Sequence, residues 1–373
     1  MNKIQMVDLY GQYHKIKSEV DQAISNVIEK SAFINGFEVK NFEAQLAKYL
    51  GTNFCIGCAS GTDALQIAYM ALGLKPGDEI ILPSFTYIAT AEAAALLGLV
   101  PIFADSEPST FNIDPKDIES KISAKTKAIV PVHLFGQCAN MEEILNIARK
   151  HQLYVIEDTA QALGSSYTFS TGKEAQAGTM GDIGITSFFP SKNLGCFGDG
   201  GALFTKSGAL AEKIRMIANH GQKQKYYHDI IGVNSRLDTL QAAILQVKLQ
   251  KLDSYLEARR KAAAFYDQAL GNIAEIEIPK RVSKHVFHQY TIKVEANKRD
   301  LLKEHLKAKE IPSMIYYPLP IHLQKAFTTK ATKENSLPIA ENLSKSVLSL
   351  PMHTELEEAQ LEFITQTIKD YFN

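Results

Sequence analysis

A lysine on a glycine-rich turn and an aspartate at the end of an apolar strand are the residues whose types and spacing could do chemistry. Lys192 lies in the segment Ser187-Phe-Phe-Pro-Ser-Lys-Asn193, and Asp158 lies in Glu157-Asp-Thr-Ala-Gln161. A lysine amine forms a Schiff base with an aldehyde, and a carboxylate paired with a pyridinium nitrogen keeps that nitrogen protonated. These are the two groups that pyridoxal phosphate chemistry requires.

Neither residue is informative alone, because most lysines are solvated and many strand-end carboxylates cap loops or pair with surface cations. The context of Lys192 adds weight: an apolar segment (185–190) precedes it and a glycine-rich segment (195–201) follows it. A lysine held among apolar groups loses the solvation of its charged form, so its pKa falls and the amine becomes nucleophilic. For Asp158, the position at a strand end beside Gln161 favours a site role only moderately.

The segment Ser60-Gly-Thr-Asp63 follows one predicted strand and opens a predicted helix. Free backbone N–H groups and the positive end of the helix dipole favour a phosphate there, and Gly61 allows close backbone approach. The alternative is that Ser60 or Thr62 only caps the helix, which needs no ligand and is the commoner use of such residues. A Walker A spacing and a G-x-G-x-x-G after the first strand are both absent, which argues against a P-loop nucleotidase and an ordinary Rossmann dehydrogenase.

The composition predicts a globular protein of about two domains. Its 373 residues are 45% hydrophobic, and 40 basic and 41 acidic side chains give a formal net charge of −1. This balance gives no reason to expect nucleic acid or an anionic membrane as a partner. The N-terminus has no apolar stretch of signal-peptide length, and the most apolar segment (93–104) is too short to span a bilayer. We therefore expect a cytoplasmic location.

Four cysteines are typical of a reducing compartment, and Cys55 and Cys58 form a C-x-x-C pair. Such a pair can be a redox motif or half of a zinc site. No second cysteine pair and no clustered histidines follow to complete a metal site. We expect two buried thiols and no metal.

Strand and helix signals alternate over the first two-thirds of the chain. Strands are predicted at 54–57, 79–82, 100–104, 128–133 and 153–157, and helices at 64–72, 90–97 and 141–151. This alternation indicates parallel strands joined by crossovers, and therefore an α/β sheet covered on both faces. Ligands bind at the carboxyl ends of the strands in such sheets. Because Asp158, Thr62 and Ser84 all follow strand ends, we expect the site there.

The pattern changes after about residue 236. A long helical region towards 270, a strand (288–294), a helix (299–309), a proline-punctuated segment (316–322) and a final helix (356–372) predict a smaller α+β domain. We place the boundary at residue 250, which gives a large cofactor-binding α/β domain (1–250) and a small C-terminal domain (251–373). The polar stretch at 165–181 indicates a hairpin or a mobile flap.

Six segments together resemble the DegT/StrS family of nucleotide-sugar aminotransferases, in the order in which that family has them. The resemblance covers nearly the whole chain, and the segments that carry it are SGTDAL (60–65), PSFTYIAT (83–90), PVHLFGQ (131–137), VIEDTAQ (155–161), SFFPSKNLGCFGDGGA (187–202) and GVNSRLDTLQAAIL (232–245). The resemblance implies the fold type I architecture of aspartate aminotransferase, with a mostly parallel seven-stranded sheet. It also implies a homodimer with shared active sites.

The resemblance assigns the cofactor contacts residue by residue. It makes Lys192 the Schiff-base lysine, Asp158 the partner of the pyridine nitrogen, and Gln161 a contact of the ring or its hydroxyl group. Tyr87 is expected to stack on the ring, although core packing is a common role for tyrosine. The expected phosphate contacts are Gly61, Thr62, Ser187 and, from the neighbouring subunit, Asn234.

The candidate contacts to the second substrate are less closely defined by the resemblance. They are His220, Arg236, Tyr316, Tyr317 and His322. Each could equally lie at a domain interface, and Arg236 could simply pair with Asp238. No metal is expected among the site residues.

The reaction implied by the resemblance has two halves. Glutamate gives its amino group to the cofactor, which leaves pyridoxamine phosphate, and this form then aminates a keto sugar attached to a nucleotide. Lys192 moves the proton in both halves, as one group serving as base and acid. A related branch of the family removes a hydroxyl group instead and has a histidine where this chain has Lys192, so the lysine favours transamination.

The resemblance is closest to enzymes that act at C3 of a 3-keto sugar, particularly those that make 2-acetamido-3-amino uronates on UDP. Such enzymes serve the biosynthesis of cell-surface polysaccharide, including lipopolysaccharide. A His-Tyr pair is common near the sugar in that group, whereas this chain has Tyr316-Tyr317. A 3-keto-6-deoxy sugar on dTDP and a 4-keto sugar therefore stay open. A cofactor-binding regulator without catalysis and a hydride-transfer enzyme are the alternatives from other classes.

Overall fold

The computed structural model describes residues 3–328 and 335–372. Its main sheet has seven strands in the order β1-β9-β8-β5-β4-β2-β3. β9 is antiparallel to both of its neighbours, and the other neighbouring strands pair in parallel. The prediction of a mostly parallel seven-stranded sheet is thus confirmed. The strands are β1 (Phe54–Cys58), β2 (Glu79–Pro83), β3 (Val100–Ala104), β4 (Thr126–Ile129), β5 (Tyr154–Asp158), β8 (Ile183–Ser187) and β9 (Gly201–Thr205).

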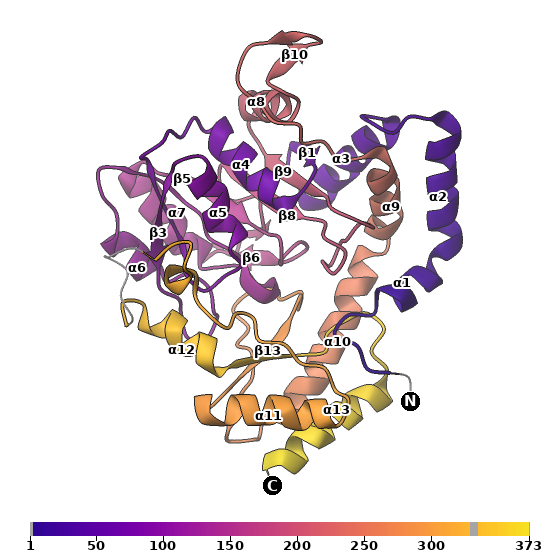
Figure 1. Ribbon diagram of the computed structural model, residues 1–373, viewed down its shortest axis with the longest axis vertical. Coiled ribbons are helices and arrows are strands. Elements are labelled where there is room, and N and C mark those ends of the chain that lie inside the picture. Colours follow the sequence, from indigo (N-terminus) through magenta and orange to yellow (C-terminus); the bar gives the residue numbers. More distant parts are fainter. Residues whose placement is uncertain (1–2, 329–334, 373) are drawn as a thin grey trace.

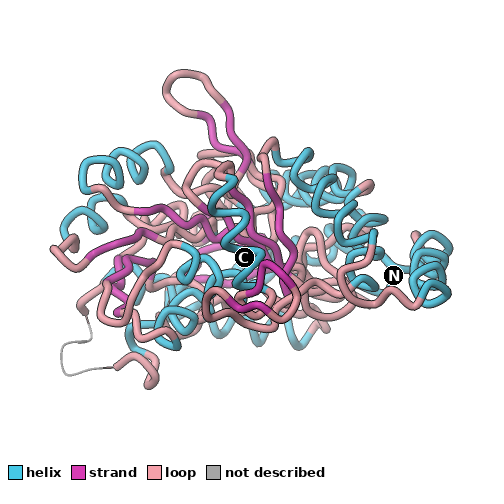
Figure 2. The backbone as a smooth tube through the Cα atoms, turned by 90° about the horizontal axis from the view of Figure 1, so that it is seen from above, coloured by secondary structure: helices cyan, strands magenta, loops and turns pink. Residues whose placement is uncertain are grey.

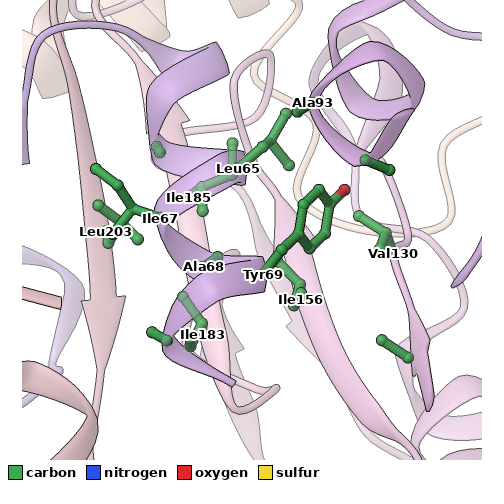
Figure 3. Packing of buried hydrophobic residues seen from close by; sticks show 14 of the residues in the cluster. Leu65, Ile67, Ala68, Tyr69, Ala93, Val130, Ile156, Ile183, Ile185 and Leu203 are labelled. Carbon is green, nitrogen blue, oxygen red and sulfur yellow. The ribbon is translucent and has the colours of Figure 1, made fainter. Parts of the chain in front are cut away.

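Helices cover both faces of this sheet (Figures 1 and 2). One face packs against α4 (Gly61–Ala71), α5 (Ala89–Leu96) and α8 (Gly208–Ala218). Figure 3 shows Leu65, Ala68 and Tyr69 of α4 lying over strand residues such as Ile156 and Ile185. The other face packs against α3 (Phe37–Leu50), α6 (Pro115–Ser120) and α7 (Met141–His151). Apolar burial on both faces explains why these strands are nearly continuous apolar runs.

Several elements differ from the sequence-based expectation. The strand predicted at 128–133 is β4, which ends at Ile129, because Pro131 has no N–H to continue the ladder. The long helical region is two helices, α9 (Thr239–Leu249) and α10 (Leu252–Leu270), which pack on different partners. The helices α1 (Leu9–Lys15) and α2 (Lys17–Lys30) lie at one end of the molecule, and α2 packs along α9 (Figure 1).

The C-terminal part contains a second, antiparallel sheet in the order β12-β13-β14. Its strands are β12 (Ile276–Glu277), β13 (Tyr290–Val294) and β14 (Val347–Leu350), and α11 (Ala296–Ala308) and α13 (Glu358–Phe372) flank it (Figure 1). Its core joins α10, α11 and α13 to these strands. The helix α12 (Pro338–Ser346) precedes β14. The domain boundary at residue 250 stays a prediction.

Two small hairpins complete the fold. β6 (Ser166–Thr168) and β7 (Glu174–Gln176) form an antiparallel pair within the polar stretch that was expected to be a hairpin or flap. β10 (Gln222–Gln224) and β11 (Tyr227–His228) form a second hairpin, which projects from the molecule in Figure 1. Short 3₁₀ turns lie at Leu134–Gly136 and Ile321–Leu323. In the described part of the chain, no helix is both long and apolar enough to cross a membrane.

Candidate active site

The carboxyl ends of β5 and β8 open into a cavity of about 520 Å³. These strands are neighbours and run parallel, so their last residues, Asp158 and Ser187, lie at the same edge of the sheet. The loop after β8 brings Lys192 to the same cavity. Nine of the residues singled out in the sequence line it: Gly61, Thr62, Tyr87, Asp158, Gln161, Ser187, Lys192, Tyr316 and Tyr317.

Asp158 is held in place by two hydrogen bonds. Thr90 Oγ1 donates to Asp158 Oδ2 at 2.9 Å, and the Ala160 N–H donates to Asp158 Oδ1 at 3.1 Å. The side chain is only 6% exposed, and burial raises the pKa of this carboxyl. The two hydrogen bonds and the charge of Lys192 oppose that rise, because each favours the ionised form. The carboxylate is oriented before any ligand arrives.

The neighbouring Glu157 has a different role, because successive strand residues face opposite sides of the sheet. Its carboxylate is fully buried and accepts hydrogen bonds from the N–H groups of Gly178, Met180 and Gly181. It also lies 3.0 Å from His133 Nε2. Glu157 thus fixes the turn before β8, and Asp158 alone reaches the cavity.

Lys192 presents its amine to the cavity. Its backbone N–H donates to Phe189 O at 2.8 Å, which closes the turn, whereas Nζ has no hydrogen-bond partner among the described residues. Burial lowers the pKa of Lys192 to about 8, against the opposing charge of Asp158. The surrounding protein therefore favours the uncharged, nucleophilic form of this amine.

A second buried lysine gives a useful contrast. Lys248 is 2% exposed, and burial lowers the pKa of Lys248 to about 8 as well. However, its Nζ donates to Gly195 O at 2.6 Å and lies over the ring of Phe197, and the residue does not line the cavity. A low amine pKa alone does not mark the site; the position facing Asp158 does.

The low pKa of Lys192 predicts how cofactor uptake depends on pH. At pH 7 a pKa of about 8 leaves about a tenth of the amine unprotonated, against about 1 in 3,000 for an ordinary lysine. The amine must lose a proton before it attacks an aldehyde. The rate of cofactor attachment should therefore rise with pH up to about 8 and then level off. The measurement is the rate at which apoprotein turns yellow with pyridoxal phosphate at a series of pH values. A rate that keeps rising towards pH 10 would contradict the low pKa.

The start of α4 lies against the end of β8 at the cavity wall. Ser60 Oγ accepts a hydrogen bond from the Asp63 N–H at 3.1 Å, so Ser60 caps the helix. A Cβ on Gly61 would lie 2.7 Å from Ser187 Cβ, so only glycine allows this approach. Thr62 and Ser187 both face the cavity there, which leaves hydroxyl groups and the helix N-terminus available to an anion.

Aromatic residues form another wall. Gln161 Nε2 donates to Tyr317 Oη at 3.0 Å, and Gln161 Oε1 accepts from the Phe135 N–H at 2.9 Å. The Tyr87 and Tyr317 rings lie with their centres 6.2 Å apart, and Tyr87 is 58% exposed. Burial raises the pKa of Tyr317, so its hydroxyl keeps its proton and can donate it.

Four of the predicted site residues do not line this cavity. His322 is buried, 2.6 Å from Ser84 Oγ and 3.3 Å from Glu341 Oε1. Arg236 donates to Asn219 Oδ1 at 3.1 Å and lines a separate hollow. His220 and Asn234 lie near the β10–β11 hairpin, and Asn234 pairs with Asn219. The roles expected of these four stay predictions, and for Asn234 the expected role is in a neighbouring subunit.

Thr90 and His288 are polar residues at the cavity that were not singled out from the sequence. Thr90 lies three positions after Tyr87, a spacing that could have placed it at the same strand end. His288 carried no local signal. Cys55 and Cys58 are free and buried, and the described residues contain no group of side chains that could hold a metal ion.

These side chains fit pyridoxal phosphate. The cofactor needs an amine for its aldehyde, an anion for its ring nitrogen and donors for its phosphate, and the cavity has one of each. Lys192 supplies the amine and Asp158 supplies the anion. The phosphate donors are Thr62 and Ser187, which lie close together because Gly61 packs directly against Ser187.

Comparison with known proteins gives the family. A model of the DegT/DnrJ/EryC1/StrS aminotransferase family matches residues 14–369. A pleiotropic regulatory protein of Geobacillus stearothermophilus is 48% identical over 375 residues, covering 99% of this chain and 98% of that protein. The UDP-2-acetamido-2-deoxy-3-oxo-D-glucuronate aminotransferase of Pseudomonas aeruginosa is 45% identical over 365 residues, with 97% and 98% covered.

Comparison with solved structures gives the same family. The crystal structure of S. venezuelae DesV in complex with a ketimine intermediate matches with a TM-score of 0.96 at 38% identity, covering 100% of this chain and 99% of that one. The expected aminotransferase fold is therefore confirmed. Since the family model spans nearly the whole sequence and the relatives match from end to end, the chain belongs to the DegT/DnrJ/EryC1/StrS aminotransferase family.

Proposed function

We propose that this chain transfers the amino group of glutamate to the C3 keto group of a UDP-linked 2-acetamido sugar. The chain is a pyridoxal phosphate-dependent nucleotide-sugar aminotransferase by family. The observation that carries the proposal is a single cavity with Lys192, Asp158 and Thr62 on its wall. The Pseudomonas aeruginosa relative is named for a UDP-linked 3-oxo sugar acid, which supports the choice of nucleotide and of C3.

The cofactor, when bound, supplies an aldehyde that takes up amino groups and a ring that stores electrons. Asp158 would hold the ring nitrogen, and Gly61, Thr62 and Ser187 would hold the phosphate. Gln161 and Tyr87 position the ring. Lys192 Nζ would take a proton from the donor carbon in the first half-reaction and give a proton to the acceptor carbon in the second, which suits an amine whose pKa is about 8. Tyr316 and Tyr317 line the same cavity and are the residues proposed to contact the sugar.

We also propose a homodimer in which each site is completed by the partner subunit's Asn234. The support is that Asn234 does not line the cavity of its own chain, while apolar side chains near it and on the N-terminal helices are exposed. Ile231 is 86% exposed and Phe37 is 72% exposed. Phe33 and Ile34, just before Phe37, are exposed as well, and contiguous exposed apolar surface is typical of a face that a second chain covers.

The dimer proposal predicts complementation between two inactive variants. Asn234→Ala and Lys192→Ala are each expected to lose most activity. In a mixed dimer, one site carries both changes and the other carries neither, so mixing the refolded variants should restore activity. Activity is followed as 2-oxoglutarate release from glutamate in the presence of the keto sugar. No gain over the separate variants would show that Asn234 acts within its own chain or not at all.

The test of the function is a panel of nucleotide-linked keto sugars. Purified protein should be yellow, and glutamate alone should bleach it. UDP- and dTDP-linked sugars with keto groups at C3 or C4 are then added one at a time, and the return of colour identifies the acceptor. The proposal requires the UDP-linked 3-keto 2-acetamido sugar to be the fastest. A faster dTDP-linked or 4-keto sugar would replace the proposed substrate.

A second candidate is a regulator that binds the cofactor without turnover, since the Geobacillus stearothermophilus relative is named a pleiotropic regulatory protein. The same panel separates the two, because a regulator would stay yellow with glutamate. We further propose a cytoplasmic location and a role in making amino sugars for cell-surface polysaccharide, including lipopolysaccharide. The availability of nucleotide-linked sugars and glutamate in that compartment supports both.

A further inference from the structure

The loop before β13 brings a histidine to the cavity that holds Lys192 and Asp158. His288 lines the cavity and is 6% exposed. Its ring makes no hydrogen bond to any described residue, and Nδ1 is completely enclosed. Nε2 is therefore the ring nitrogen that is left open to the cavity.

The rings of the other buried histidines, unlike that of His288, each make at least one hydrogen bond within the described part of the protein. His285 Nδ1 accepts the Phe287 N–H at 2.9 Å, and His353 Nδ1 accepts the Glu355 N–H at 3.2 Å. His322 lies between Ser84 and Glu341. Buried polar groups are nearly always hydrogen-bonded in native proteins, so an unpartnered ring at a cavity wall points to a partner that enters the cavity.

The backbone around His288 is fixed on both sides. Arg259 Nη1 donates to Phe287 O at 3.1 Å and to His288 O at 3.4 Å. The Gln289 N–H donates to Phe135 O at 3.2 Å. Gly136, at φ +118°, lies against this loop, and a Cβ there would be 2.9 Å from the backbone nitrogen of His288. The ring is thus presented to the cavity by a rigid support.

The chemistry of the ring limits what it can bind. Burial lowers the pKa of His288 well below its ordinary value, and the charges of Lys192 and Arg259 act in the same direction. The ring is therefore neutral near pH 7, with one N–H donor and one acceptor nitrogen. Such a ring suits a hydroxyl or an amide, whereas a carboxylate is bound better by a cation. Glutamate presents carboxylates, and a sugar presents hydroxyl and amide groups.

We propose that His288 Nε2 hydrogen-bonds an uncharged polar group, a hydroxyl or an amide, on the sugar beside the carbon that reacts at Lys192. His288 then contributes to binding of the sugar in its half-reaction and has no part in binding glutamate in the other half-reaction. This inference rests on the proposed function.

The experiment compares the two half-reactions in the same protein. Yellow holoenzyme is bleached either by glutamate or by a UDP-linked 2-acetamido-3-amino sugar, which runs the sugar half in reverse. The variants are His288→Leu, which removes both nitrogens, and His288→Gln, which keeps a donor and an acceptor. His353→Leu is the matched control, because His353 is also buried but does not line the cavity.

For His288→Leu, the half-saturating concentration of the amino sugar should rise about tenfold, while that of glutamate changes less than about twofold. His288→Gln should recover most of the loss, and His353→Leu should leave the ratio of the two constants unchanged. An equal loss in both halves, or no loss in either, overturns the inference. A wild-type enzyme that glutamate bleaches and no amino sugar bleaches overturns the proposed function instead.

Discussion

Replacing Lys192 with alanine is expected to lower transamination by at least about 10⁴-fold, the upper range for loss of a positioned proton-transfer group. Lys192 is the lysine whose amine reaches the cavity beside Asp158, and nothing among the described residues competes for its Nζ. The variant loses both the attachment of the cofactor and the group that moves the proton. The measurement is 2-oxoglutarate release at saturating glutamate and keto sugar.

Two further variants make that result specific. Lys192→Arg keeps a positive charge but has no nucleophilic amine, so it should be as inactive as Lys192→Ala. Lys248→Met removes the other buried amine and its hydrogen bond to Gly195 O. It should lower turnover only modestly, because Lys248 positions the turn after Lys192 and does not touch the cavity. A Lys192→Ala enzyme with activity near that of the wild type would refute the role given to Lys192.

Replacing Asp158 with asparagine is expected to lower turnover about 100-fold or more, comparable to losing one preorganised electrostatic contact in an active site. Asparagine has the same shape: its Oδ1 can still accept from the Ala160 N–H, and its NH₂ group can donate to Thr90 Oγ1, which now accepts. It lacks the charge that keeps the ring nitrogen protonated, so electrons from the broken C–H bond are stored less well. The measurement is the rate at which glutamate bleaches the holoenzyme in a single turnover.

The matched control for this change is Glu157→Gln. Glu157 is also a buried carboxylate on β5, but it is bonded to the turn before β8 and faces away from the cavity. Loss of the Glu157 charge should lower the melting temperature, because it weakens a buried hydrogen-bonded network. The effect on the bleaching rate of the folded enzyme should be smaller. Bleaching of Asp158→Asn at close to the wild-type rate would mean that another group protonates the ring.

Much of the framework followed from local pattern. The strands were short apolar runs, because both faces of the sheet are covered, and Asp158 was placed correctly by the rule that ligands bind at strand ends. The helix at 141–151 was predicted to the residue, since Ile144, Ile147 and Ala148 repeat with helical spacing and are buried. The strand predicted at 128–133 was wrong in its bounds, because β4 begins at Thr126 and ends at Ile129, before Pro131.

Long-range packing explains what local pattern did not reveal. His288 reaches the cavity only because Arg259, on α10, and Phe135, after β4, hold its loop. His322 has the right residue type for a sugar contact, yet its ring is enclosed between β2 and α12 by Ser84 and Glu341. The local sequence around a histidine does not determine whether its ring lines the cavity or is enclosed by other side chains. Arg236 contacts Asn219 outside the cavity, and the role expected of Asn234 lies in a neighbouring subunit, so both roles stay predictions.

The most direct test of the central claim is to find which lysine holds the cofactor. The holoenzyme is reduced with borohydride, digested and examined by mass spectrometry. Among the residues that the structure describes, Lys192 and Lys248 are the two lysines whose pKa burial lowers to about 8, and of these only Lys192 lines the cavity with Asp158. The cofactor mass should appear on the peptide that contains Lys192 and on no other. Label on the Lys248 peptide, or no label on a yellow protein, would contradict the account.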